Sequence, residues 1–271
     1  MTTGQLACEV RGVLLEADPV RKVFLARRVV RDWRSGRLAR DEVVPMPDAP
    51  PRPDRPELLA PGKMPKRGRM GSVRSRIAML HALAHIEYVA IDLAFDMVGR
   101  FGIDSSPQFV DDWLGVGADE ALHFALLLRR LRALGSAYGA LPAHDGLWEA
   151  AQATAHDRLA RLAVVPMVLE ARGLDVTPDT VERFRAAGDE RSAAALDRIY
   201  KDEIRHVEAG VRWFTIYCEI ERISPVQRWH SLVQQYFRGA LKPPFNNSAR
   251  LAAGLTKEFY LPLAASAAIA D

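Results

Sequence analysis

The pattern of apolar and polar positions from Ser72 onward is typical of long amphipathic helices. In the first of them, apolar side chains recur at steps of three, four or seven, in the order Ile77, Leu80, Ala84, Ile91, Ala94 and Val98. Gly99 and Gly102 predict where this helix ends. No sustained period-two run bounded by hairpin turns occurs in the chain, so the sequence predicts no β-sheet.

Three more long helices are predicted, over residues 107–134, 147–172 and 189–221. Ser106 and Pro107 supply an N-cap and a first-turn proline for the second. Pro166 is expected to bend the third helix and Gly173 to end it, before a short helical turn that starts at Thr177. Four helices joined by short connections predict an all-α bundle.

The segments on either side of the bundle have a different character. Residues 1–71 begin with two short helices, the second capped by Asp18, and continue into a proline-rich strap over 46–65. Leu58, Leu59 and Met64 are its expected apolar anchors. We therefore predict three parts, which are an N-terminal arm (1–71), the bundle (72–222) and a helical tail (223–271) that packs on the bundle.

Composition narrows the class of protein. Of 271 residues, 49% are hydrophobic, which excludes a wholly disordered chain. Two distant cysteines, Cys8 and Cys218, exclude a disulfide scaffold and a zinc ribbon. The N-terminus lacks a basic region followed by an apolar one, and the longest apolar run, Phe259–Ala270, is too short for a membrane helix. We expect a cytoplasmic protein that does not insert into membranes.

The net charge of +3 hides an uneven distribution. Residues 1–76 hold 17 Lys and Arg against 9 Asp and Glu, whereas the remainder holds 20 against 25. The basic 63–76 segment is a candidate for binding nucleic acid, and a solvated segment packed over the acidic body explains the same charges. Only Phe24 and Trp33 are aromatic in the arm, which gives little support to base stacking.

Two helices carry the same five-residue element. The two copies are Asp119-Glu120-Ala-Leu-His123 and Asp202-Glu203-Ile-Arg-His206. Glu and His three residues apart lie on one face of a helix and can hold one metal centre. The other two long helices each carry a Glu 33 residues earlier, Glu87 and Glu170, and Asp92 and Asp175 follow these by five residues. An internal duplication of a helix pair explains this arrangement.

Four carboxylates in one bundle core would repel each other and lose their hydration, so the arrangement requires metal. Two divalent cations cancel four negative charges. Carboxylate and imidazole ligands suit iron or manganese, and the lack of thiolates argues against a structural zinc site. The predicted metal ligands are Glu87, Glu120, His123, Glu170, Glu203 and His206.

This pattern resembles the di-iron carboxylate proteins of the ferritin-like superfamily over residues 72–222. The resemblance implies a ferritin-like four-helix bundle in which Glu120 and Glu203 bridge two metals, while Glu87 and Glu170 are terminal ligands. The Asp-Glu-x-Arg-His form around Arg205 resembles bacterial di-iron monooxygenases, although Leu122 stands in the equivalent place of the first half. The whole chain also resembles a bacterial family of uncharacterised ferritin-like proteins, which has no established activity to transfer.

Residues that lie beside the predicted ligands are candidates for supporting roles. Asp119 and Asp202 are candidates to accept the second ring N–H of a histidine ligand. Tyr200 is a weak candidate for catalysis, because its counterpart Gly117 would leave open volume beside one half of the centre. His85 lies on a different face of the helix from Glu87, so we expect it to form a hydrogen bond rather than bind metal.

The leading functional hypothesis is an oxidoreductase that activates O2 at two Fe ions, or at Mn or mixed Mn/Fe, and hydroxylates or otherwise oxidises an organic substrate. The substrate is a small molecule or a nucleotide, and the basic arm makes a modified tRNA base one candidate. The electron donor and oligomeric state stay open. Iron storage, a manganese catalase, and a nucleic-acid-binding module with a structural di-metal site are the alternatives.

Overall fold

The computed structural model describes residues 4–65 and 70–269, and it is all-α apart from one pair of two-residue strands. The chain falls into two compact units. The first comprises residues 1–148 and 183–195, and the second comprises 149–182 and 196–271.

In the first unit two long helices form a hairpin. Helix α3 (Val73–Phe101) begins with a capping box between Ser72 and Ser75, and α4 (Pro107–Ala133) begins at the Ser106 cap. A short connection of residues 102–106 makes the two helices antiparallel neighbours. Both predicted helices are confirmed, with ends within two residues of those expected.

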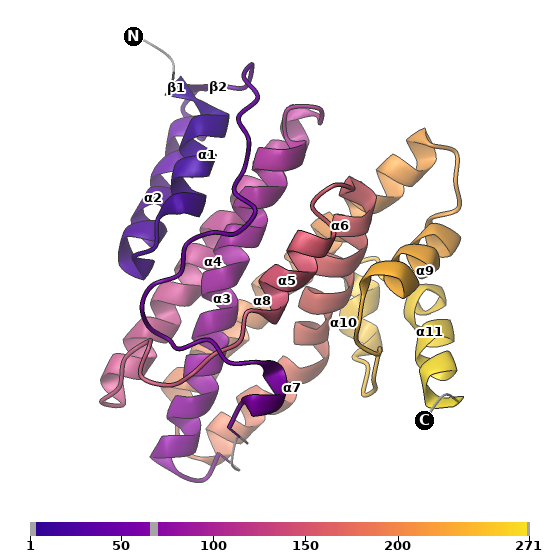
Figure 1. The fold of residues 1–271 in the computed structure, drawn as a ribbon. Helices are drawn as coiled ribbons and strands as arrows, with labels where there is room; N and C mark the ends of the chain where they lie inside the picture. Colours follow the sequence, from indigo (N-terminus) through magenta and orange to yellow (C-terminus); the bar gives the residue numbers. More distant parts are fainter. Residues whose placement is uncertain (1–3, 66–69, 270–271) are drawn as a thin grey trace. The chain divides into compact units, whose positions relative to one another are not determined.

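The N-terminal arm packs on this hairpin (Figure 1). Helices α1 (Leu6–Leu15) and α2 (Pro19–Arg34) lie against α3 and α4, and Asp18 caps α2 as predicted. Strands β1 (Gly4–Gln5) and β2 (Leu38–Ala39) pair in parallel at the start and end of this helix pair. The prediction of no β-sheet is therefore wrong for this one pair of strands, because a two-residue strand is too short to show a period-two pattern.

Polar contacts help to hold the strap, and of its expected apolar anchors Leu59 and Met64 are half-buried. Leu58 is 39% exposed, whereas the backbone N–H of Leu59 donates to the carbonyl of Ala143 over 2.8 Å. The Arg52 guanidinium pairs with Asp145 at 2.9 Å. Further along, η1 (Pro61–Lys63) is a single short turn.

The predicted third helix is wrong in its continuity. The segment consists of α5 (Gly146–Ala153), α6 (Arg158–Val164), a π-helix η2 (Val165–Glu170) and α7 (Ala171–Ala186). A break precedes α6, where Asp157 caps the new helix. Gly173 does not end the helix and Pro178 lies inside α7, because burial of Leu174, Val181 and Phe184 outweighs the local preference for a turn.

Helix α8 (Glu190–Ile220) confirms the fourth prediction. The tail supplies α9 (Pro225–Tyr236), α10 (Asn247–Ala252) and α11 (Lys257–Ile269) to the second unit (Figure 1). The indole N–H of Trp229 on α9 donates to the carbonyl of Ala163 on α6. The tail is therefore helical, as expected.

Helix α3 is also long and apolar enough, by length and composition, to cross a bilayer. However, 67% of its most apolar window is buried inside the protein, and Glu87, Asp92 and Asp96 lie in its core-facing surface. These properties fit a buried core helix.

Candidate metal centre

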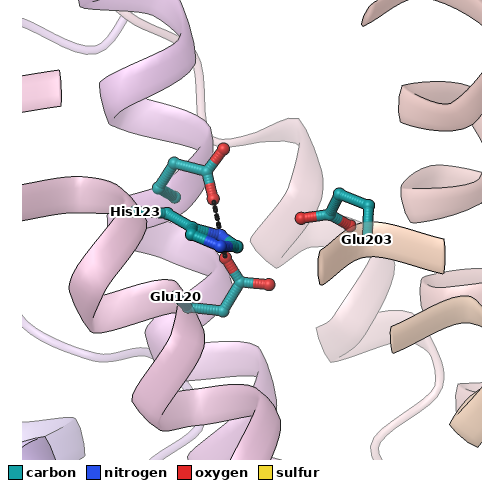
Figure 2. A group of neighbouring side chains, drawn as sticks. Glu120, His123 and Glu203 are labelled. Atoms are coloured by element: carbon teal, nitrogen blue, oxygen red, sulfur yellow. Dashed lines mark hydrogen bonds and ion pairs between the residues drawn. The ribbon is translucent and has the colours of Figure 1, made fainter. Parts of the chain in front are cut away.

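The α3–α4 hairpin brings three of the predicted ligands together. Nδ1 of His123 lies 3.3 Å from Oε2 of Glu120, one turn away on α4, and 3.4 Å from Oε2 of Glu87 on α3. Figure 2 shows Glu120 and His123 pointing to the same place. All three side chains are buried. The Glu-x-x-His spacing therefore does what the helix geometry predicts.

Burial and mutual charge dominate the electrostatics of this cluster. Loss of hydration and the neighbouring Glu120 carboxylate together raise the pKa of Glu87 well above its usual value. Burial alone would lower the pKa of His123, but its contacts with Glu120 and Glu87 outweigh burial and raise that pKa to about 11. Without metal, an imidazolium compensates the two acidic side chains. When His123 loses its proton, a bound metal cation can supply the positive charge instead.

The donor set fits a divalent metal ion. The ligand atoms of Glu87, Glu120 and His123 lie within 4.8 Å of one another. Two carboxylates and one imidazole are ligands that iron, manganese and zinc accept, and they lack the thiolates of structural zinc sites. The buried Glu/His cluster could therefore hold a metal ion, although the donor atoms alone do not select among these metals.

The second unit repeats part of this arrangement. On α8, Nδ1 of His206 lies 3.6 Å from Oε1 of Glu203, and both residues are buried. Figure 2 also labels Glu203 on α8. Glu170, the remaining predicted ligand, is the last residue of the π-helix η2 and is half-buried.

The π-helix gives Glu170 a different local setting from Glu87, which lies in a regular α-helix. Proline lacks an amide N–H, and a widened turn accommodates the missing hydrogen bond at Pro166. Gly210 on α8 lies against this proline: a Cβ at Gly210 would come within 2.4 Å of the Cβ of Pro166. The expected bend is therefore a π-helical turn, and π-turns often occur at functional sites.

Each half also contains a buried aspartate five residues beyond its predicted Glu ligand. Asp92 is fully buried and pairs with Lys22 from α2 and Arg52 from the strap. Asp175 is paired with Arg250 of α10, whose guanidinium lies 2.7 Å from Oδ2. The arm and the tail are thus attached in the same way to equivalent helices, each within its own unit. The sequence showed the two aspartates but not their basic partners.

The structure gives the burial or the hydrogen-bond partners of the residues that lie beside the predicted ligands in sequence. Asp202 is buried and accepts from Arg198 at 2.6 Å and from Arg205, both on α8. Asp119 is half-buried on α4. Their proposed hydrogen bonds to histidine ligands remain predictions. The hydroxyl of Tyr200 accepts from the side-chain amide of Asn246 at 3.0 Å.

The open volume expected at Gly117 is absent. A Cβ there would come within 2.6 Å of Cε2 of Phe95, so the ring of Phe95 fills the space that a side chain would occupy. Gly117 serves the close approach of α3 and α4 rather than access for a substrate. This expectation was wrong because sequence spacing does not show which aromatic ring turns toward a glycine.

The histidines of α3 outside the ligand set are held by hydrogen bonds. Nδ1 of His85 lies 2.8 Å from the hydroxyl of Tyr138, which confirms the expectation for His85. Nε2 of His81 accepts from the backbone amides of Gly139 and Leu141 at 2.9 and 3.4 Å. Tyr138 stacks on both imidazole rings, and no sequence motif pointed to it.

Of the basic 63–76 segment, Lys66, Arg67 and Arg69 lie outside the described residues. Arg76 is committed to the fold, because its guanidinium donates to the carbonyl of Ala187 at 2.7 Å. Nucleic-acid binding by this segment stays a prediction.

Comparison with known proteins places the chain in a family. A family model described as a protein of unknown function, DUF455, matches residues 15–261. The chain belongs to this family. A protein of Haemophilus influenzae described as uncharacterized is 40% identical over 222 residues, which is 80% of this chain and 77% of the relative. No solved structure matches the chain. The match includes most of the arm, both Glu-x-x-His elements and most of the tail.

Proposed function

We propose that the protein is an O2-dependent oxidoreductase with a two-metal carboxylate centre in a ferritin-like four-helix bundle. The helices of the bundle would be α3, α4, the α6–η2–α7 segment and α8. Each unit would contribute three ligands: Glu87, Glu120 and His123 from the first, and Glu170, Glu203 and His206 from the second. Iron is the expected metal, with manganese or a mixed Mn/Fe pair as the alternative.

The observation that carries this proposal is the buried cluster of Glu87, Glu120 and His123 in a hairpin whose elements recur in the second unit. Helix α4 begins at residue 107 and α8 at residue 190, and the offset of 83 also relates each ligand to its counterpart. Even the caps correspond, because Ser106 accepts from the amide of Phe109 and Asp189 accepts from that of Ser192. The three ligands of the first unit would form half of a six-ligand centre, and the three equivalent residues of the second unit would supply the other half.

The chain's own side chains supply the setting for the reaction. Glu87, Glu120, Glu170 and Glu203 would together give the four negative charges that two divalent cations balance. Metal bound at these ligands would supply the redox chemistry that amino-acid side chains lack. The ion pairs of Asp92 and Asp175 hold the ligand-bearing helices to the arm and the tail, which fixes the positions of the ligands.

The test is anaerobic loading with Fe(II), followed by metal analysis and measurement of O2 consumption with a chemical reductant. We expect two metal ions per chain and O2 uptake that Glu120→Ala and Glu203→Ala each abolish. Glu190→Ala, an exposed change on α8, is the matched control and should leave both unchanged. Protein that binds no iron or manganese would refute the proposal. Rapid peroxide dismutation with manganese would identify a catalase instead, and a hollow oligomer of many chains would identify a storage protein.

A further inference from the structure

A separate cavity lies in the first unit, beside the first two turns of α3. Its volume is about 660 Å³, within the range of sites for small organic molecules. Its walls are mainly aliphatic. They include Met64, Ile77, Ala78, Ala82, Leu141 and Pro142.

Two nitrogen-bearing side chains, His81 and Arg74, interrupt this apolar lining. Among the described residues that line it, none is acidic. Arg74 is exposed and forms no ion pair with the described part of the chain. The cavity therefore offers apolar walls together with an uncommitted positive charge.

The protonation state of His81 follows from its backbone contacts. Nε2 accepts from the amides of Gly139 and Leu141, so this nitrogen carries no proton. Burial lowers the pKa of His81 to about 4, which keeps the ring neutral near pH 7. The proton of the neutral ring then resides on Nδ1, and Nδ1 has no hydrogen-bond partner within residues 4–65 and 70–269. A ring fixed by Tyr138 thus presents one unused donor.

This cavity is distinct from the candidate metal centre. Ala78 and Glu87 are nine residues apart on α3, a separation of about 180° around the helix axis. The cavity therefore lies on the side of α3 opposite the predicted ligand. Occupation of one site does not require occupation of the other.

We propose that this cavity binds a carboxylate with an unbranched apolar chain. The chain would lie against the aliphatic walls, and the carboxylate would accept a hydrogen bond from Nδ1 of His81 and pair with Arg74. A neutral alkane would leave the His81 donor unsatisfied, and a cationic ligand would be repelled by Arg74. A carboxylate satisfies both groups, and charge-assisted hydrogen bonds of this kind are the stronger class.

Calorimetric titration of the full-length protein with decanoate tests the proposal. We expect saturable binding of one decanoate per chain, with or without metal. Ala78→Trp should abolish binding by filling the cavity, whereas Val176→Trp, at an exposed position on α7, should leave it unchanged. Arg74→Gln should weaken decanoate binding about tenfold while leaving the binding of 1-decanol unaltered, because only the carboxylate carries charge.

A second readout keeps the test independent of folding in the tryptophan variant. In 15N-labelled protein, decanoate should shift the Nδ1 resonance of His81 and leave that of His230 in place. Equal decanoate affinity in the parent and Ala78→Trp proteins would overturn the proposal. It would also be overturned by an Nδ1 resonance of His81 that does not move at saturating decanoate, or by an Arg74→Gln protein that retains full affinity.

Discussion

Replacing Asp92 by Asn tests the buried ion pair that holds the N-terminal arm to α3. The side chains of Asp92 and Lys22 are both fully buried, and the ammonium also donates to the carbonyl of Val13 at 3.0 Å. Asparagine keeps the shape and one acceptor but removes the charge. Arg52, the other partner of Asp92, retains Asp145. A protonated Lys22 would then be a buried cation without its counterion.

The expected magnitude follows from the cost of a buried, uncompensated charge. Removing one partner of a buried pair typically costs about 3–5 kcal/mol in the free energy of unfolding. Burial already lowers the pKa of Lys22, and loss of Asp92 lowers it further. Where the pH exceeds the lowered pKa of Lys22, the unfolded chain binds more protons than the folded chain, so the stability of the variant rises with pH, by at most about 1.36 kcal/mol per unit, up to the usual lysine value.

Urea unfolding of the parent and Asp92→Asn proteins at pH 7 and pH 9 measures both effects. The stability deficit of the variant should shrink between these pH values, by at most about 2–3 kcal/mol. Asp175→Asn is the matched control, because its partner Arg250 stays charged throughout this range and its deficit should not change. A deficit below about 1 kcal/mol at pH 7, or one that is independent of pH, would contradict the assignment of a buried Lys22 charge.

Three further predictions concern other sites. Gly117→Ala should cost about 1–3 kcal/mol because of the contact with Phe95, and a smaller side chain at Phe95 should restore stability in thermal melts. Metal binding should release protons into weakly buffered solution at pH 7.5 because the pKa of His123 is raised to about 11, and a dye that records no release would contradict this protonation state. A thiol reagent should modify exposed Cys8 rapidly and buried Cys218, whose pKa burial raises to about 11, only on unfolding; equal rates would refute this difference.

The helices of the hairpin could be predicted from the sequence because local signals and burial agree there. Ser106 is both a good cap and the actual cap, and the apolar stripe of α3 is the buried face. The third helix could not be predicted in the same way. The proline at 178 and the glycine at 173 are local breakers, and only the packing of the surrounding apolar residues keeps α7 intact. Likewise, the strap is held in part by backbone hydrogen bonds between Glu57 or Leu59 and Ala143, which leave no trace in the side-chain pattern.

At the candidate site, spacing was sufficient to find Glu120 and His123 because three residues along a helix fix their relative direction. Glu87 followed from the repeat. The partners of the buried aspartates, Lys22 and Arg250, are distant from them in sequence, and Lys22 belongs to the arm, whose basic charge suggested an external partner. Part of the basic character of the arm is thus used inside the fold, which the composition alone does not reveal.

The most direct test of the central claim is the metal stoichiometry of the purified full-length protein after anaerobic loading with Fe(II) or Mn(II) and removal of loosely bound metal. The account predicts two ions per chain, and loss of both when either Glu120 or Glu203 is replaced by Ala, because both halves share one centre. A protein that retains no metal, or one in which Glu203→Ala leaves the stoichiometry unchanged, would contradict it.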